Sequence, residues 1–469
     1  MSKEVSLANL MAGKESPTKW IPGEFNVTKQ APLPEEYLAT AEEAANYVEQ
    51  YRIKTADTSY WDFLKEESNN KNLSLYDGSA GIVYFYSMLY KVTNDKKYYD
   101  IALSGGNYLA VNWKEQLDYS QANDADNFNL NYYTGVIGIA AVLLHLIKIG
   151  ISSKYESALQ AIADYTIAVA KSDEKGLYWV DSPGFMGDAG ITVTLFEIGK
   201  ILNNNELIQQ ADKAAKRILD SGKEDSDHGG KYWPKAAQPL FDFNLPNFEL
   251  GTAGVGYALT LFYQFTGDEG YLEGAKQAAI YVRSIAIKQG DGYLVPYRLI
   301  ADEKPFFYVG SCHGPNGTSK LFYSLYKITQ DKTYLDDIEA FYNGLNHLGA
   351  PQKQSTGYWK NTSLCCGTAG LLQFYINAFN VTHDKKYLDS SQVAANILLS
   401  ERRTFETESG IGSVWPIVYT RVVPDEISEF GGYLTGAAGI ATTLLQFYLV
   451  TINNFEWHKL SDDPFPENA

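Results

Sequence analysis

Three cysteines are the residues of this sequence with the clearest capacity for chemistry. Cys312 lies two positions before Gly314, Cys365 lies two positions before Gly367, and Cys366 directly follows Cys365. An odd number of cysteines cannot form a complete set of intramolecular disulfides. The chain holds 3 Cys in total, so reduced thiols with a chemical role are the better expectation.

The matched positions of Cys312 and Cys365 predict a metal site. If the two glycines belong to neighbouring units of one repeat, equivalent positions lie side by side and the thiols converge. Three thiolates without a fourth cysteine are typical of a zinc ion that keeps an open coordination position. A helix beginning just after each cysteine would also favour the thiolate over the thiol. The alternative is that Cys312, Cys365 and Cys366 are unreactive buried cysteines, a common state of free Cys.

An open zinc position permits two kinds of chemistry. The ion can bind water for hydrolysis, or it can bind a substrate thiolate and keep it nucleophilic at neutral pH. A zinc ion with three thiolate ligands carries a formal charge of about −1 and is a weaker Lewis acid than one with neutral ligands. This charge favours thiol transfer over activation of water.

The elements that must position the cysteines belong to a sevenfold repeat. A Gly-x-x-Gly turn followed by an apolar, helix-forming run recurs along the chain, as expected for a repeat architecture. An amphipathic stretch with apolar residues at three- and four-residue spacing precedes each copy. The copies begin at Gly78, Gly135, Gly187, Gly251, Gly314, Gly367 and Gly436.

This repeat predicts an all-α fold, an α/α toroid of seven inner and seven outer helices. The runs after the glycines are apolar nearly all round and suit buried helices, whereas the amphipathic stretches can face water outside them. We expect the glycines to avoid collisions of a Cβ where seven backbones crowd together. Short aromatic segments such as 176–179 and 230–233 predict extended pieces at one rim. The toroid should span residues 33–455, between an N-terminal arm, 1–32, and a C-terminal tail, 456–469.

Composition excludes several partners. The chain has 39 Lys+Arg and 56 Asp+Glu, a net charge of −17, which disfavours nucleic acid and anionic membrane surfaces. No apolar run approaches the ~20 residues that span a bilayer, and the N-terminus lacks the apolar core of a signal peptide. We therefore expect a cytoplasmic protein without membrane insertion. The acidic sequence 124–127 lacks a suitably spaced Glu for a calcium loop and is interpreted as a polar turn.

Residues 311–314, Ser-Cys-His-Gly, and 364–367, Leu-Cys-Cys-Gly, within seven Gly-x-x-Gly helices resemble the lanthionine synthetase C (LanC-like) family. The resemblance covers the chain from about Leu33 to Val450. It implies one zinc ion, held by Cys312, Cys365 and Cys366, that presents a peptide Cys thiolate to dehydroalanine or dehydrobutyrine. The implied product is a thioether (lanthionine or methyllanthionine) ring, and the implied partners are a dehydrated precursor peptide and a separate dehydratase.

The chain departs from the family pattern around the metal motif. Ser311 replaces a Trp, and Cys366 replaces a His ligand, as in the Cys-Cys-Gly variant of these synthetases. Leu250 stands where family members commonly place a His, and Asn131 stands where they place an Asp. An Arg usually lies a few residues before the first zinc Cys, and the nearest candidate here is Arg298.

Because of these departures, the acid or base is expected among the six histidines of the chain. Addition of a thiol to a dehydrated residue creates an enolate, which must be protonated. His313, next to a ligand, is the first candidate, and His228, on the loop that leads into the fourth inner helix, is the second. Asn131, Glu249 and Asp188 are expected to face the substrate at the rim. His145 is interpreted as a core residue, and no role is assigned to His347, His383 and His458.

Three other functions stay open from the sequence. A LanC-like protein can add glutathione or another small thiol to dehydrated residues. A noncatalytic, peptide-binding relative would fit Leu250 and Asn131. A carbohydrate-active toroid would need paired carboxylates on the inner rim, and its candidates are Glu249 with Asp77 or Asp188.

Overall fold

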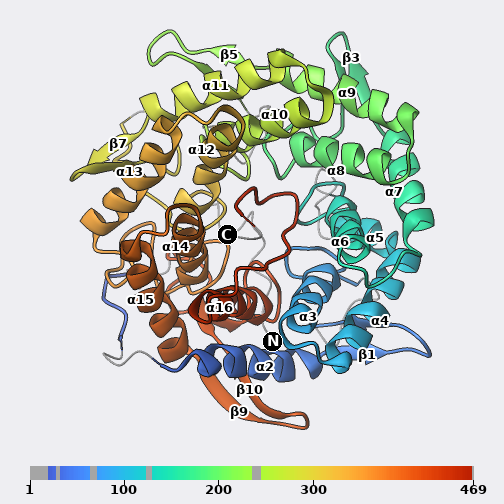
Figure 1. Cartoon of the computed structure of the whole chain (residues 1–469), viewed down its shortest axis with the longest axis vertical. Helices are drawn as coiled ribbons and strands as arrows, with labels where there is room; N and C mark the ends of the chain where they lie inside the picture. The colour runs from blue at the N-terminus through green and yellow to red at the C-terminus, as the bar shows by residue number, and fades with distance from the viewer. Residues whose placement is uncertain are drawn as a thin grey trace.

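The computed structural model describes residues 20–27, 32–63, 71–122, 129–234, 244–300 and 302–466. The described helices form two concentric rings, seen end-on in Figure 1. This confirms the α/α toroid of seven inner and seven outer helices. The proposed polar turn at 124–127 lies outside the described residues. Within the ranges above, no helix is long and apolar enough to cross a membrane.

The inner ring consists of the helices that follow the Gly-x-x-Gly turns. Their first-turn amides bond to carbonyls of the preceding turn, as Thr368 N does to Asn361 O at 3.2 Å and Ala369 N to Thr362 O at 3.1 Å. Each inner helix contacts the next, from α3 round to α16 and back to α3. The inner helices are α3 (Ser79–Thr93), α6 (Val136–Lys148), α8 (Asp188–Ile201), α10 (Thr252–Thr266), α12 (Pro315–Thr329), α14 (Thr368–Thr382) and α16 (Ala437–Thr451).

The outer ring consists of amphipathic helices, and each packs against the inner helix that precedes it in sequence. The first outer helix, α2, has no such predecessor and packs on α16, so the chain closes the ring near its two ends (Figure 1). Asp or Asn side chains cap α4, α9, α11 and α15. The outer helices are α2 (Pro34–Glu49), α4 (Lys96–Asn112), α7 (Glu156–Ala168), α9 (Asn205–Asp220), α11 (Glu269–Ser284), α13 (Thr333–Leu348) and α15 (Lys385–Glu401), and a short helix, α5 (Glu115–Ala122), follows α4.

Two-stranded antiparallel hairpins join outer helices to the next inner helix. Three of them are followed by a buried Trp whose indole N–H donates to the end of the preceding outer helix: Trp179 to Thr166 O, Trp233 to Ile218 O and Trp415 to Leu398 O, at 2.6–2.7 Å. These aromatic segments anchor the hairpins. The pairs are β1 (Arg52–Lys54) with β2 (Ser59–Trp61), β3 (Lys171–Asp173) with β4 (Gly176–Tyr178), β5 (Lys223–Glu224) with β6 (Lys231–Tyr232), β7 (Ile287–Gln289) with β8 (Gly292–Leu294), β9 (Arg403–Thr407) with β10 (Gly410–Val414), and β11 (Pro416–Val418) with β12 (Ile427–Glu429).

The repeated glycines are required by close backbone contacts. A Cβ on Gly251 would lie 1.9 Å from Leu245 O, and one on Gly254 would lie 1.8 Å from Phe248 O. Both carbonyls belong to the turn of the same repeat, so the expected crowding among seven backbones is only part of the reason. The neighbouring repeat contributes at the second glycine, where a Cβ on Gly370 would lie 2.8 Å from Gly310 Cα.

The chain after α16 turns inward and fills the middle of the inner ring (Figure 1). Trp457, Leu460 and Phe465 are buried there. Tyr84 Oη on α3 donates to His458 O at 3.0 Å, and Tyr257 Oη on α10 donates to Ser461 O at 2.6 Å. The segment 452–466 therefore forms part of the core of the toroid.

Candidate metal centre

A closed belt of backbone hydrogen bonds links the turns that precede the inner helices. Glu249 N donates to Cys312 O at 3.1 Å, Cys312 N to Cys365 O at 3.2 Å, and Cys365 N to Leu434 O at 2.9 Å. The belt then returns to its start at 2.7–2.9 Å, through Leu434 N to Tyr76 O, Tyr76 N to Tyr133 O, Tyr132 N to Met186 O, and Met186 N to Glu249 O. We call the residue two places before the first glycine of each repeat the belt position.

The belt brings the three cysteines together, as their shared register predicted. Cys312 Sγ lies 3.5 Å from Cys366 Sγ, and Cys366 Sγ lies 3.3 Å from Cys365 Sγ. All three sulfur atoms lie within 4.8 Å of one another. Cys312 and Cys365 are buried and Cys366 is half-buried. The turns before α12 and α14 therefore hold three soft ligands in one place, although 53 residues separate Cys312 from Cys365.

The three thiols differ in pKa. Hydrogen bonds with Cys312 and Cys365 lower the pKa of Cys366 to about 5. Burial raises the pKa of Cys312 well above its ordinary value. The pKa of Cys365 is also raised, because the hydrogen bond with Cys312 is outweighed by that with Cys366 and by burial. The bare cluster thus favours a single thiolate, on Cys366.

The expectation that helix N-termini favour all three thiolates agrees with the lowered pKa of Cys366, whereas burial and the neighbouring thiols raise the pKa values of Cys312 and Cys365. The first amides of α14 are already bonded to turn carbonyls, and Cys366 N donates to Ser363 Oγ at 3.3 Å. Hydrogen bonds with the two neighbouring thiols are the largest cause of the lowered pKa of Cys366.

The donor set fits a zinc ion. Zinc–sulfur bonds of about 2.3 Å in a tetrahedron place sulfur atoms ~3.8 Å apart, close to the 3.3 and 3.5 Å found here. A dication bound by the three sulfurs would also allow all three cysteines to be thiolates at the same time. Cys312, Cys365 and Cys366 would hold the ion.

His313 and Glu249 flank this cluster. A carboxylate oxygen of Glu249, Cys312 Sγ and a ring nitrogen of His313 all lie within 4.8 Å of one another. The buried His313 ring packs against Tyr297 and Tyr308, with ring centroids 4.9 and 5.9 Å apart. Burial raises the pKa of Glu249 well above its ordinary value. Of the residues proposed for acid–base or substrate roles, His313 and Glu249 reach the cysteines.

His228, the second acid–base candidate, lies elsewhere. It is exposed on the turn between β5 and β6, and its Nδ1 lies 3.2 Å from Asp225 Oδ1. Figure 1 shows the β5 hairpin at the outer edge of the ring. The structure does not bring His228 to the cysteines, because this loop projects outward instead of following the belt.

Asn131 and Asp188 both accept hydrogen bonds within their own turns, although the buried Nδ2 of Asn131 has no hydrogen-bond partner among the described residues. Asn131 Oδ1 accepts from Thr134 N at 2.6 Å, and Asp188 accepts from the amides of Trp179, Val180 and Ser182 at 2.9–3.2 Å. Asp77 accepts from Thr435 Oγ1. Asp77 and Asp188, the two candidates for pairing with Glu249, are thus engaged in hydrogen bonds of their own, which disfavours the carbohydrate-active alternative.

One contact of the cluster and one nearby charge were not predicted from the sequence. Tyr76 Oη, at the belt position of the first repeat, donates to Cys365 Sγ at 3.3 Å. Arg421, between β11 and β12, lies 4.6 Å from the Phe306 ring centroid, donates to Tyr308 Oη at 3.1 Å, and contributes to the lowered pKa of Cys366. Arg298, the candidate nearest Cys312 in sequence, instead pairs with Glu303 at 2.6 Å. The register of the repeat could have identified Tyr76, whereas Arg421 lies in a loop without periodicity.

Comparison with known proteins supports the family and the fold of the chain. The family model for lanthionine synthetase C-like proteins matches residues 69–460. Among solved structures, nisin cyclase superposes with a TM-score of 0.59 and 17% sequence identity, over 88% of this chain and 94% of that chain. This similarity supports the toroid fold.

Solved structures that superpose less well include an inactive variant of an alpha-1,6-mannanase of a Salegentibacter species, with a TM-score of 0.46 and 14% identity over 88% of this chain and 99% of that one. The cellobiose 2-epimerase from Spirochaeta thermophila has a TM-score of 0.46 and 13% identity, over 90% and 97% of the two chains. No curated protein sequence matches the chain significantly.

Proposed function

The chain belongs to the lanthionine synthetase C-like family, and we propose that it is a zinc-dependent cyclase acting on a dehydrated precursor peptide. Its reaction would add a peptide Cys thiolate to dehydroalanine or dehydrobutyrine and form a thioether ring. The observation that carries this proposal is the convergence of Cys312, Cys365 and Cys366 at 3.3–3.5 Å between consecutive sulfurs. A separate dehydratase would supply the substrate.

The cysteines would hold one zinc ion, which when bound supplies an electrophilic centre that keeps a substrate thiolate nucleophilic at neutral pH. His313 would move protons, because its ring nitrogen lies beside the cluster and its ring is fixed between Tyr297 and Tyr308. Protonation at the α-carbon of the enolate completes the addition. Leu250 has no titratable group, so His313 takes the part that a His at that position has in the family.

The proposal is tested by metal analysis and by incubation of the zinc-loaded protein with a dehydrated peptide that contains Cys. We expect about one zinc per chain, loss of the free thiol of the peptide, and no change in its mass, because cyclisation is an isomerisation. His313→Asn should slow ring formation while retaining zinc. Absence of zinc, or a free thiol that persists with zinc bound, would contradict the proposal.

The same experiment separates two related functions. A mass increase in the presence of glutathione would identify addition of a small thiol. Intact zinc binding without turnover would identify a noncatalytic peptide-binding protein, which Leu250 and Asn131 favour because neither can act as the acid or base found at those positions in the family.

A further inference from the structure

We propose that Glu249 is an exchangeable fourth ligand of the metal, which the incoming thiolate displaces. This inference rests on the proposed zinc site, and it concerns the state of that site before the substrate binds. It assigns a carboxylate to the position that the sequence leaves open among three cysteines.

The first argument is register. Glu249, Cys312 and Cys365 occupy the belt positions of the fourth, fifth and sixth repeats. Consecutive backbone hydrogen bonds, 3.1 Å from Glu249 N to Cys312 O and 3.2 Å from Cys312 N to Cys365 O, hold the three in line. The other four belt positions hold side chains that do not ligate zinc in this way: Tyr76, Tyr133, Phe185 and Leu434.

The second argument is the environment of the carboxylate. Glu249 is only 9% exposed, and its side chain has no hydrogen bond or ion pair within the described chain. Lys320, which lines the same small cavity, is the one cation that attracts the carboxylate among the described residues, and it is shared with Asp462, from which it lies 3.5 Å away in an ion pair. A buried carboxylate with no hydrogen bond and only a shared cation is costly unless it is neutralised or coordinates a metal.

The third argument is reach. The Glu249 oxygen already lies within 4.8 Å of Cys312 Sγ, and a small movement of a flexible side chain would bring it to a zinc held there. His313 is less free to move, because Tyr297 and Tyr308 pack against its ring. Glu249 also lines a cavity of about 30 Å³, room for about one water, into which the displaced carboxylate can withdraw.

The test uses the full chain loaded with zinc or cobalt, and N-acetylcysteine as the probe thiol. In Glu249→Gln we expect zinc affinity to fall about tenfold, and N-acetylcysteine to bind the cobalt-loaded protein several-fold more tightly because its competitor is gone. Chelator competition measures the first change, and the visible spectrum of cobalt measures the second. Glu303→Gln, which removes a carboxylate paired with Arg298, is the matched control and should change neither.

Glu249→Cys provides an independent arm. A fourth sulfur at this belt position should raise zinc affinity above wild type and abolish binding of N-acetylcysteine. Unchanged zinc and thiol affinities in Glu249→Gln, or free access of the thiol in Glu249→Cys, would overturn the inference while leaving a three-cysteine site intact. Failure of the wild-type protein to bind zinc would instead contradict the proposed function.

Discussion

Two halves of the belt, of three repeats each and with Leu434 of the seventh repeat between them, are joined by similar backbone hydrogen bonds but carry different side chains. From the fourth to the sixth repeat the belt position carries Glu249, Cys312 and Cys365, whereas from the first to the third it carries Tyr76, Tyr133 and Phe185. Both halves are linked by hydrogen bonds of 2.7–3.2 Å. The glycine turns and the belt therefore determine where a belt side chain lies, and the residue type at that one position determines whether it stabilises the ring or holds a ligand.

The largest expected effect comes from removing a sulfur from the ligand half. Cys365→Ser should weaken zinc binding by more than about 100-fold, since loss of outer partners of a metal ligand alone costs 10- to 100-fold. Chelator competition gives the affinity, and circular dichroism checks the fold.

Tyr133→Phe is the control in the aromatic half. Tyr133 Oη donates to Asp462 Oδ2 at 2.9 Å and not to a cysteine, so this variant should keep wild-type zinc affinity. Equal losses in Cys365→Ser and Tyr133→Phe would show that zinc binding depends on ring integrity and not on the ligand half.

The comparison also shows what the sequence could predict. The ring and the meeting of the cysteines followed from periodicity, because equal positions in a closed repeat become neighbours in space. The segment 452–466 has no repeat register, and its place inside the ring depends on individual contacts such as Tyr257 Oη with Ser461 O. Arg421 and the outward-facing His228 likewise lie in rim loops that the repeat does not constrain. The sequence also shows that Glu249 is in register with the cysteines. Because Leu250 stands at the position of the family His, the neighbouring Glu249 was expected to contact the substrate and not to bind the metal.

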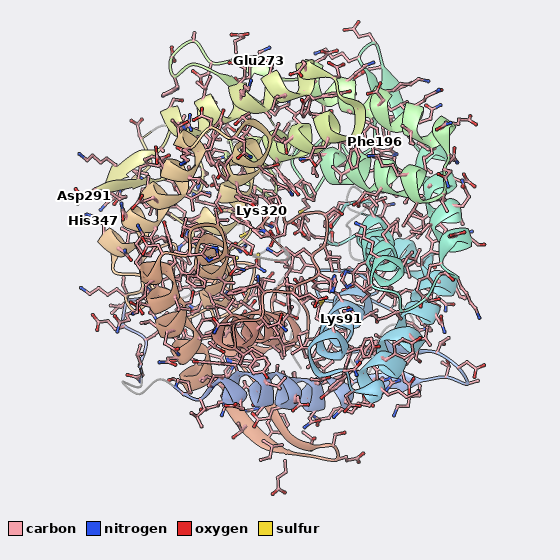
Figure 2. The ribbon with its side chains drawn as sticks, viewed as in Figure 1. Lys91, Phe196, Glu273, Asp291, Lys320 and His347 are labelled. Atoms are coloured by element: carbon pink, nitrogen blue, oxygen red, sulfur yellow. The ribbon has the colours of Figure 1, made fainter. Side chains whose placement is uncertain are left out.

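The halves differ below the belt as well, where inner helices carry buried basic residues. Lys320 on α12 points into the middle of the ring (Figure 2) and pairs with Asp462, whereas His145 on α6 has its Nε2 3.1 Å from Ser87 Oγ. Burial lowers the pKa of His145 to about 3. His145 is thus a buried core residue, as predicted, and its burial favours the neutral form.

This neutral state predicts a pH effect of intermediate size. Below pH 6.5 the histidine is protonated in the unfolded chain but stays neutral in the folded protein. The free energy of unfolding therefore decreases as the pH falls. Between pH 6.5 and pH 5 the loss is about 2 kcal/mol. Burial raises the pKa values of Asp77 and Asp188 to about 6. These two carboxyls therefore bind protons more readily in the folded state and increase the free energy of unfolding as the pH falls.

The measurement is therefore a difference between proteins. Urea unfolding of wild type and His145→Gln at several pH values should show the wild type losing about 2 kcal/mol relative to the variant between pH 6.5 and 5. His347→Gln, at an exposed histidine on the outer edge of the ring (Figure 2), is the surface control for loss of an imidazole. A pH-independent difference for His145→Gln would contradict the buried neutral state.

The smallest effect concerns the contact that joins the two halves. Tyr76 belongs to the aromatic half, yet its hydroxyl donates to Cys365 Sγ at 3.3 Å. Tyr76→Phe should lower zinc affinity by no more than about tenfold, because it removes an outer hydrogen bond and leaves all three sulfurs in place. Tyr375→Phe is the matched control, since its buried hydroxyl has no hydrogen bond within the described chain. If Tyr76→Phe reduced zinc affinity as much as Cys365→Ser, the aromatic half would be part of the metal site and the division of the belt would be wrong. A small loss of zinc affinity in Tyr76→Phe would show that a side chain of the aromatic half strengthens zinc binding through its hydrogen bond to Cys365.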